Sequence, residues 1–324
     1  GSMASAVSAD PKDRAELSTW RTIGSTLANM VIGVATPMVA YVVVDGKTVM
    51  SGSRMTIIAG VFSICAILCY IVCFKLTRER VEVPASSQKV SASAIFKSIF
   101  TNRALLGIIV AAIFVLLSQL TVMSLAGYVY PNVYGSAAAQ STASLLGTVI
   151  MLIVCAPFAS KLAAKFGKKE LAVASSICSA LVWLVCLIWR PASVWGFVAC
   201  YILANIGMGF FNTIIWAMIT DVIDDAEVRS GIREDGTIYS VYSFARKLGQ
   251  AFSSGLVGAL LGIIGYTEAT AFDPAVTRGI FNMACIAPII GFVCIVLALV
   301  FLYPLNKKKV EENVAALAAR RNNK

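Results

Sequence analysis

Eight apolar runs, each long enough to cross a lipid bilayer, limit what this chain can fold into. A membrane-spanning helix needs about 20 consecutive, mainly apolar residues. Only 14% of the 324 residues are charged, against about 25% in soluble domains. The sequence therefore predicts an all-α integral membrane protein and excludes an ordinary soluble enzyme and a disordered chain. The runs cover residues 20–44, 54–76, 104–130, 141–163, 171–190, 194–220, 237–265 and 279–304.

The basic residues alternate between successive loops. Of the 27 Lys and Arg residues, 21 lie in one alternating set of loops and tails and four in the other set. Because basic loops stay on the cytoplasmic side, we expect both termini to be cytoplasmic in a multi-pass protein of the cell inner (plasma) membrane. The net charge of +10 is spread over separate segments, which argues against nucleic acid as a partner.

The longest polar segment divides the chain unequally. Residues 1–76 hold two spans, and residues 77–103 form a polar loop that ends in an amphipathic helix at 94–103. Residues 104–304 hold six spans, and 305–324 form a cytoplasmic tail. Transporters are usually built from bundles of equal size, so two spans followed by six predict part of a larger arrangement.

Side-chain amides inside the apolar runs are the first candidate site residues. Gln119 lies in the third run, and Asn205 and Asn212 lie seven residues apart, on one face of the sixth. Amides are costly in lipid and mark either helix packing or function. For Gln119 and Asn212 the two interpretations are about equally supported.

Two adjacent cations make the seventh run the most informative. Arg246 and Lys247 lie in an otherwise apolar helix, and Ser243 and Gln250 share the face of Lys247. Cations at that depth need anionic partners or a wet cavity. No carboxylate lies near the centre of any run, so the partner is a substrate, a cofactor or a part of the protein not present here.

The densest charge cluster is TDVIDDAEVRSGIREDG, residues 220–236. It is either a solvated loop or a network that latches helices at the cytoplasmic face. The cluster lacks the spacing of a calcium-binding loop. The chain contains no histidine, and we expect no metal site in it.

Three stretches resemble the glycoside–pentoside–hexuronide:cation symporter family, the melibiose-carrier-like group of the major facilitator superfamily. They are Asp10–Asn29, Ala159–Glu170 and, most specifically, Trp216–Ala251. The resemblance implies a major facilitator superfamily bundle in which these eight spans are equivalent to helices 5–12 of 12. The first four helices are apparently lacking.

The resemblance also implies a function and residue roles. It implies cation-coupled symport of a sugar, glycoside or hexuronide by alternating access, with this chain inactive alone. Arg21, Lys247 and Ser243 match substrate-side positions, to which Asn212 and Gln119 are added from the residue argument above. The cytoplasmic charge network comprises Asp221, Asp224, Glu227 and Arg233.

The remaining expectations concern partners and alternatives. The coupling cation, Na⁺ or H⁺, is expected at carboxylates outside this chain, and no cofactor is expected. The partners are the sugar or glycoside, the cation, the lipid bilayer and the missing N-terminal helices. The alternative function is a non-transporting membrane receptor or scaffold of the same fold. An enzyme is not expected, because no activated nucleophile, catalytic carboxylate or metal cluster stands out.

Overall fold

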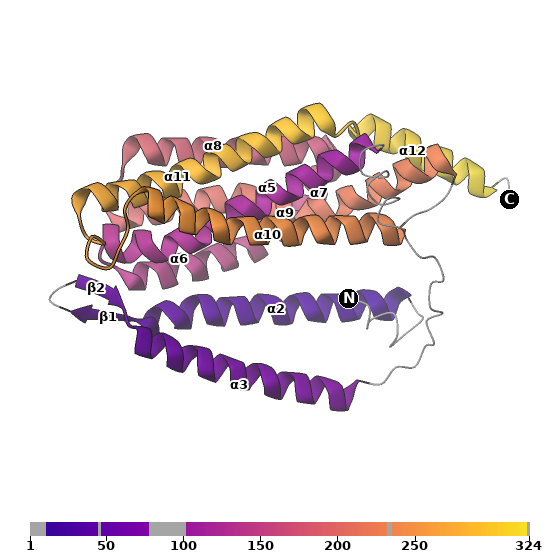
Figure 1. The fold of residues 1–324 in the computed structure, drawn as a ribbon. Helices are drawn as coiled ribbons and strands as arrows, with labels where there is room; N and C mark the ends of the chain where they lie inside the picture. Colours follow the sequence, from indigo (N-terminus) through magenta and orange to yellow (C-terminus); the bar gives the residue numbers. More distant parts are fainter. Residues whose placement is uncertain (1–10, 45–46, 78–101, 232–234, 323–324) are drawn as a thin grey trace. The chain divides into compact units, whose positions relative to one another are not determined.

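The computed structural model describes residues 11–44, 47–77, 102–231 and 235–322, which are almost entirely helical (Figure 1). They belong to two compact units. The first comprises Gly1–Lys89 and Ser136–Thr148, and the second Val90–Gly135 and Val149–Lys324. The amphipathic helix expected at 94–103 lies outside the described residues, apart from its last two positions.

Seven of the described helical segments are long and apolar enough to cross a membrane. They confirm an all-α membrane protein. Helix α10, Asp235–Ile263, matches the remaining expected span in position and has 29 residues. It is not among the seven, because its polar residues, Arg246 and Lys247 above all, lower its hydropathy. The seven are Ile23–Ala40, Gly52–Leu76, Arg103–Val133, Ala137–Cys155, Lys168–Trp189, Val194–Ser230 and Pro274–Leu302.

The first unit contains a helical pair joined by a β-hairpin. Helix α2, Pro11–Ala40, ends four residues before the expected boundary at residue 44. The β-branched run that follows it forms strand β1, Tyr41–Val44, which pairs antiparallel with β2, Lys47–Met50. Helix α3, Gly52–Leu76, then runs back beside α2 (Figure 1).

Helix α6, Ala137–Ile150, belongs to the first unit through its N-terminal part. Ser141 Oγ donates a hydrogen bond to the Val34 carbonyl at 3.0 Å. Gly33 faces Ser144 so closely that an added Cβ would lie 3.4 Å from the serine Cβ. Small residues at a helix crossing let two backbones approach, as is typical of membrane helices.

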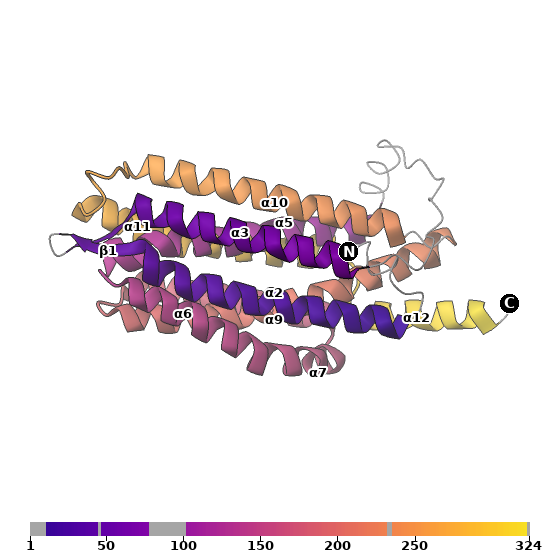
Figure 2. The same cartoon turned by 90° about the horizontal axis from the view of Figure 1, so that it is seen from below.

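The second unit is a bundle around helix α5, Arg103–Tyr128. Leu105, Ile108 and Val115 of α5 are fully buried. Their neighbours come from α9, Val194–Ser230, from α10 and from α11, Pro274–Leu297, which run along the same axis as α5 (Figures 1 and 2). Helices α8, Lys168–Trp189, and α11, Pro274–Leu297, complete the bundle.

Two spans contain π-helical turns at prolines. Helix α5 continues into η1, Val129–Val133, which contains Pro131. The span expected at 141–163 is α6, a π turn η2, Met151–Cys155, and α7, Ala156–Phe166, with Pro157 in the first turn of α7. Proline removes a backbone donor, and in membrane helices a local π turn can satisfy the backbone groups that are freed.

Helix α9, Val194–Ser230, extends beyond the expected span. Its 37 residues correspond to about 55 Å, against a hydrocarbon core of about 30 Å. The C-terminal turns of α9 therefore project past the core. There they meet α12, Lys307–Asn322, which follows the short π turn η3, Ala298–Leu302. We call this end of the second unit the α12 end.

Candidate functional site

Two of the expected substrate residues are joined by a hydrogen bond inside the second unit. Asn212 Nδ2 of α9 donates to Gln119 Oε1 of α5 at 3.3 Å. Both side chains are half-buried. The bond leaves each amide with further donor and acceptor capacity, so the pair can contact a polar ligand as well as each other.

Lys247 lies on an exposed face of α10 together with Ser243, one turn earlier. Its ammonium donates to Gln250 Oε1 at 3.1 Å, within the same helix. Among the described residues, no carboxylate pairs with Lys247, and no hydrogen bond joins it to Gln119 or Asn212. The structure therefore does not bring all the expected substrate residues together.

Arg246 has a different environment from its neighbour. Its guanidinium donates to Tyr242 Oη at 3.3 Å and lies 5.5 Å from the Trp216 ring and 5.8 Å from the Tyr242 ring. The two rings meet edge to face, with centroids 5.3 Å apart. Cation–π contacts thus hold the guanidinium of Arg246, a residue of α10, against Trp216 of α9. Arg246 follows Tyr242 by four residues, and this spacing, one helical turn, is the sequence signal for the contact between them.

Arg21 belongs to α2, in the first unit. Its backbone is helical, but its side chain lies outside the described part of the structure. Its role at the substrate stays a prediction.

The α12 end contains two ion pairs, whose members differ in part from those of the charge network expected from the sequence. Lys168, the first residue of α8, donates to Asp221 Oδ1 at 2.6 Å. The Asp221 side chain is buried, whereas that of Lys168 is 32% exposed. Asp221 was expected here. Lys168 was not, although it belongs to the basic loop after the fourth run.

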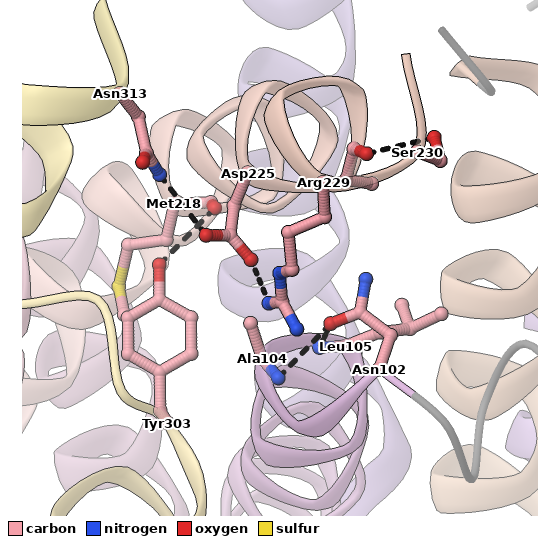
Figure 3. Close-up of polar contacts among 10 residues, drawn as sticks. Asn102, Ala104, Leu105, Met218, Asp225, Arg229, Ser230, Tyr303 and Asn313 are labelled. Carbon is pink, nitrogen blue, oxygen red and sulfur yellow. Dashed lines mark hydrogen bonds and ion pairs between the residues drawn. The ribbon is translucent and has the colours of Figure 1, made fainter. Parts of the chain in front are cut away.

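A second ion pair lies one turn further along α9. Asp225 is buried and accepts from Arg229 on the same helix and from Asn313 of α12, the latter at 3.0 Å (Figure 3). Arg320 donates to the carbonyls of Glu227 and Val228, at 3.2 and 2.9 Å. Because cations and amides satisfy the last carbonyls of a helix, these contacts fix α12 to the C-terminus of α9.

The other expected members of the network are less informative. Asp224 and Glu227 are half-buried on α9. Arg233 lies outside the described residues. Asp225 and Arg229 lie in the predicted cluster 220–236 but were not singled out as network members, and Asn313 was not predicted. The i, i+4 spacing of Asp225 and Arg229 is the sequence signal for their pair.

Tyr303, directly after η3, links the network to the bundle. Its hydroxyl donates to the Met218 carbonyl at 3.3 Å (Figure 3). Its own carbonyl accepts from Lys169 Nζ at 2.6 Å. Burial, reinforced by the nearby carboxylates of Asp221 and Glu170, raises the pKa of Tyr303 well above 10.0. The phenol therefore remains a neutral donor.

Comparison with known proteins agrees with the helical membrane protein described above. Residues 1–307 match the family described as MFS/sugar transport protein. The chain is 29% identical to the uncharacterized symporter YjmB of Bacillus subtilis, over 95% of this chain and 66% of that protein. It is 26% identical to the glucuronide carrier protein homolog of Escherichia coli, over 99% and 69%. It is 28% identical to the putative sulfoquinovose importer of Salmonella typhimurium, over 99% and 67%.

The chain spans about two thirds of the length of these curated relatives. The family match covers every described span and all of the expected site residues, and it ends at the first residue of α12. The relatives are named as a symporter, a carrier and an importer, not as enzymes. This chain belongs to the MFS/sugar transport protein family, whose members are membrane proteins.

Proposed function

We propose that this chain is part of a secondary active transporter that carries a sugar, glycoside or hexuronide together with a coupling cation, by alternating access. The substrate residues are Lys247, Ser243, Gln119 and Asn212 on the second unit. Arg21, which belongs to the first unit, is proposed as a substrate residue from the family resemblance. The proposal includes a multi-pass location in the cell inner (plasma) membrane with both termini cytoplasmic.

The position of Lys247 is the observation that carries this proposal. It lies twelve residues after Asp235 and sixteen before Ile263, or about 18 and 24 Å from the two ends of α10. A lysine near the bilayer centre costs roughly 2.5–3.5 kcal/mol on insertion scales. Both ends of α10 are far away, so the Lys247 side chain cannot easily place its ammonium at the membrane surface and avoid this cost. A water-filled cavity in which the ammonium faces substrate oxygens accounts for the charge.

The chemistry of the proposed substrate residues suits an oxygen-rich substrate. Lys247 offers up to three donors to sugar hydroxyls or to an acid group, while Gln119 and Asn212 offer both donors and acceptors. A glucuronide, named for one relative, carries a carboxylate, and a point charge at Lys247 would attract it. The proposed substrates therefore include hexuronides as well as neutral glycosides.

The coupling cation is proposed to be Na⁺ or H⁺. Symporter appears in the name of one relative. Among the described residues, the buried carboxylates Asp221 and Asp225 are both engaged at the α12 end, away from the centre of the spans. We therefore place the cation at carboxylates outside these 324 residues.

The test is uptake by membrane vesicles that contain the full-length protein. Radiolabelled glucuronide is supplied under an imposed Na⁺ or H⁺ gradient, and the initial rate is normalised to the amount of protein inserted. Lys247→Ala should lose roughly tenfold or more of the rate, as expected for loss of one charged hydrogen bond. Lys247→Arg should restore little, because a planar fork does not replace a compact ammonium.

Phe252→Ala on the same helix is the matched control, since Phe252 is 58% exposed and has no proposed contact with substrate. Near-normal uptake by Lys247→Ala would remove Lys247 from the site. Saturable binding by the wild-type protein without gradient-driven accumulation would favour the receptor or scaffold instead.

A further inference from the structure

A cavity of about 520 Å³ opens at the α12 end of the second unit. Its walls come from the first residue of α5, the last turns of α9, and the segment from Pro304 into α12. Four of its lining side chains are cations: Arg103, Arg229, Lys308 and Lys309. This cavity is separate from the substrate residues proposed above.

The lining carries two more positive charges than negative ones. Its two carboxylates belong to Asp225 and Glu312. Asp225 is already matched by Arg229 and Asn313. Glu312 lies 3.4 Å from Lys309, and both side chains are about half exposed.

The excess charge belongs to Arg103 and Lys308. Arg103 donates to the Phe301 carbonyl through one nitrogen and keeps other donors of its guanidinium. Lys308 is exposed and has no hydrogen-bond or ion-pair partner among the described residues. Neither cation is paired with a carboxylate there. An anion in the cavity would therefore meet two cations whose charge is not already neutralised.

The cavity lies at the ends of three spans, the level at which phospholipid headgroups are expected. Span α5 begins at Arg103, the last span ends at Leu302, and α9 ends at Ser230, so the lining residues stand at or just beyond three helix ends. Figure 3 shows Arg229 reaching from Asp225 toward the start of α5, where Asn102 caps the backbone of Ala104 and Leu105.

This location and charge select one class of ligand. Basic pockets between spans at the membrane surface bind anionic headgroups. Guanidinium groups bind phosphate through two parallel hydrogen bonds, and lysine adds a point charge. We propose that this cavity binds one phosphate-bearing anion, with Arg103 and Lys308 as its principal contacts. The anion is supplied either by an anionic phospholipid headgroup or by free phosphate.

The test is native mass spectrometry of the full-length protein, delipidated in detergent and titrated with phosphatidylglycerol or with zwitterionic phosphatidylcholine. Wild-type protein should bind one phosphatidylglycerol more tightly than phosphatidylcholine. Each basic residue near a membrane surface raises the affinity for an anionic lipid about fivefold. Lys308→Gln, which breaks no described contact, should weaken this binding roughly fivefold, and Arg103→Gln with Lys308→Gln roughly 30-fold.

The control removes the same charge elsewhere. Lys161→Gln with Lys165→Gln lies on α7, outside the cavity lining, and should leave the binding unchanged. Inorganic phosphate at millimolar concentration is a second arm. If phosphate binds and phosphatidylglycerol does not, the source is free phosphate. Equal binding by wild type and the double variant in both arms would overturn the proposal.

Discussion

At the scale of single residues, the Gln119–Asn212 hydrogen bond can be tested for a role beyond packing. Gln119→Leu removes the acceptor of the Asn212 amide. It should lower stability by about 0.6 kcal/mol, the average for such bonds between membrane helices, and by no more than about 1.7 kcal/mol, the largest value measured. Adding Asn212→Leu removes the stranded donor, so stability should largely return. Thermal unfolding of the detergent-solubilised protein measures both steps.

If the two amides contact the substrate as proposed, uptake should not return with stability in the double variant, because both are gone. If Gln119→Leu with Asn212→Leu transports at the wild-type rate, the pair serves helix packing alone.

The Lys168–Asp221 ion pair allows a second test. Lys168→Ala leaves the buried Asp221 carboxylate without its cation, and should lower the free energy of unfolding by about 1–3 kcal/mol. Asp221→Asn should cost less, since a neutral amide needs no cation. In the combined variant, much of the loss caused by Lys168→Ala should be recovered. Strictly additive losses in unfolding experiments would contradict an energetic coupling between the two side chains.

These pairs also show what could be predicted about the site. Lys247, Gln119 and Asn212 could be identified because a polar residue inside an apolar run is visible in the sequence, and Asp221 because it lies in a dense charge cluster. Their partners were harder to predict. Lys168 meets Asp221 across 53 positions, and Asn313 meets Asp225 across 88. Such contacts depend on how helices pack, which local periodicity does not specify.

At the scale of helices, α5 packs closely on the end of the last span through Gly107. A Cβ at Gly107 would lie 2.8 Å from the backbone nitrogen of Tyr303, which cannot move like a flexible side chain. Gly107→Ala should therefore destabilise the protein by about 1–3 kcal/mol, the usual cost of overpacking. The midpoint of thermal unfolding should fall accordingly.

Gly258→Ala on α10 is the control, because nothing lies within 4 Å of its added Cβ. Alanine is the better helix former by about 1 kcal/mol, so this variant should be neutral or slightly more stable. Equal effects of the two substitutions would argue against close packing at Gly107.

The helices themselves were largely predictable, and the irregular elements were not. Long apolar runs predicted the spans, because the thickness of a bilayer sets the length of a span and an apolar span satisfies its backbone hydrogen bonds as a helix. The hairpin at Tyr41–Met50 was missed because Tyr41–Val44 continues an apolar run without interruption. The π turns η1 and η2, which lie at or beside Pro131 and Pro157, were not predicted, because hydropathy and length do not specify a local change of helix type.

At the scale of the whole molecule, the described helices give the positions at which orientation can be measured. Lys168, Lys169 and the run Lys307–Lys309 lie at the α12 end. The opposite end carries Glu268, in the connection between α10 and α11. By the positive-inside rule, the α12 end is expected in the cytoplasm and Glu268 outside.

Cysteine labelling of intact cells tests this orientation. Glu268→Cys and Glu311→Cys both replace exposed carboxylates, one at each end of the second unit. A membrane-impermeant maleimide should label Glu268→Cys in intact cells. It should label Glu311→Cys only after permeabilisation. The parent protein, whose nine cysteines lie in apolar runs, gives the background for both. Labelling of Glu311→Cys in intact cells would reverse the orientation and place the basic cavity at the outer surface, while the helix packing would stand unchanged.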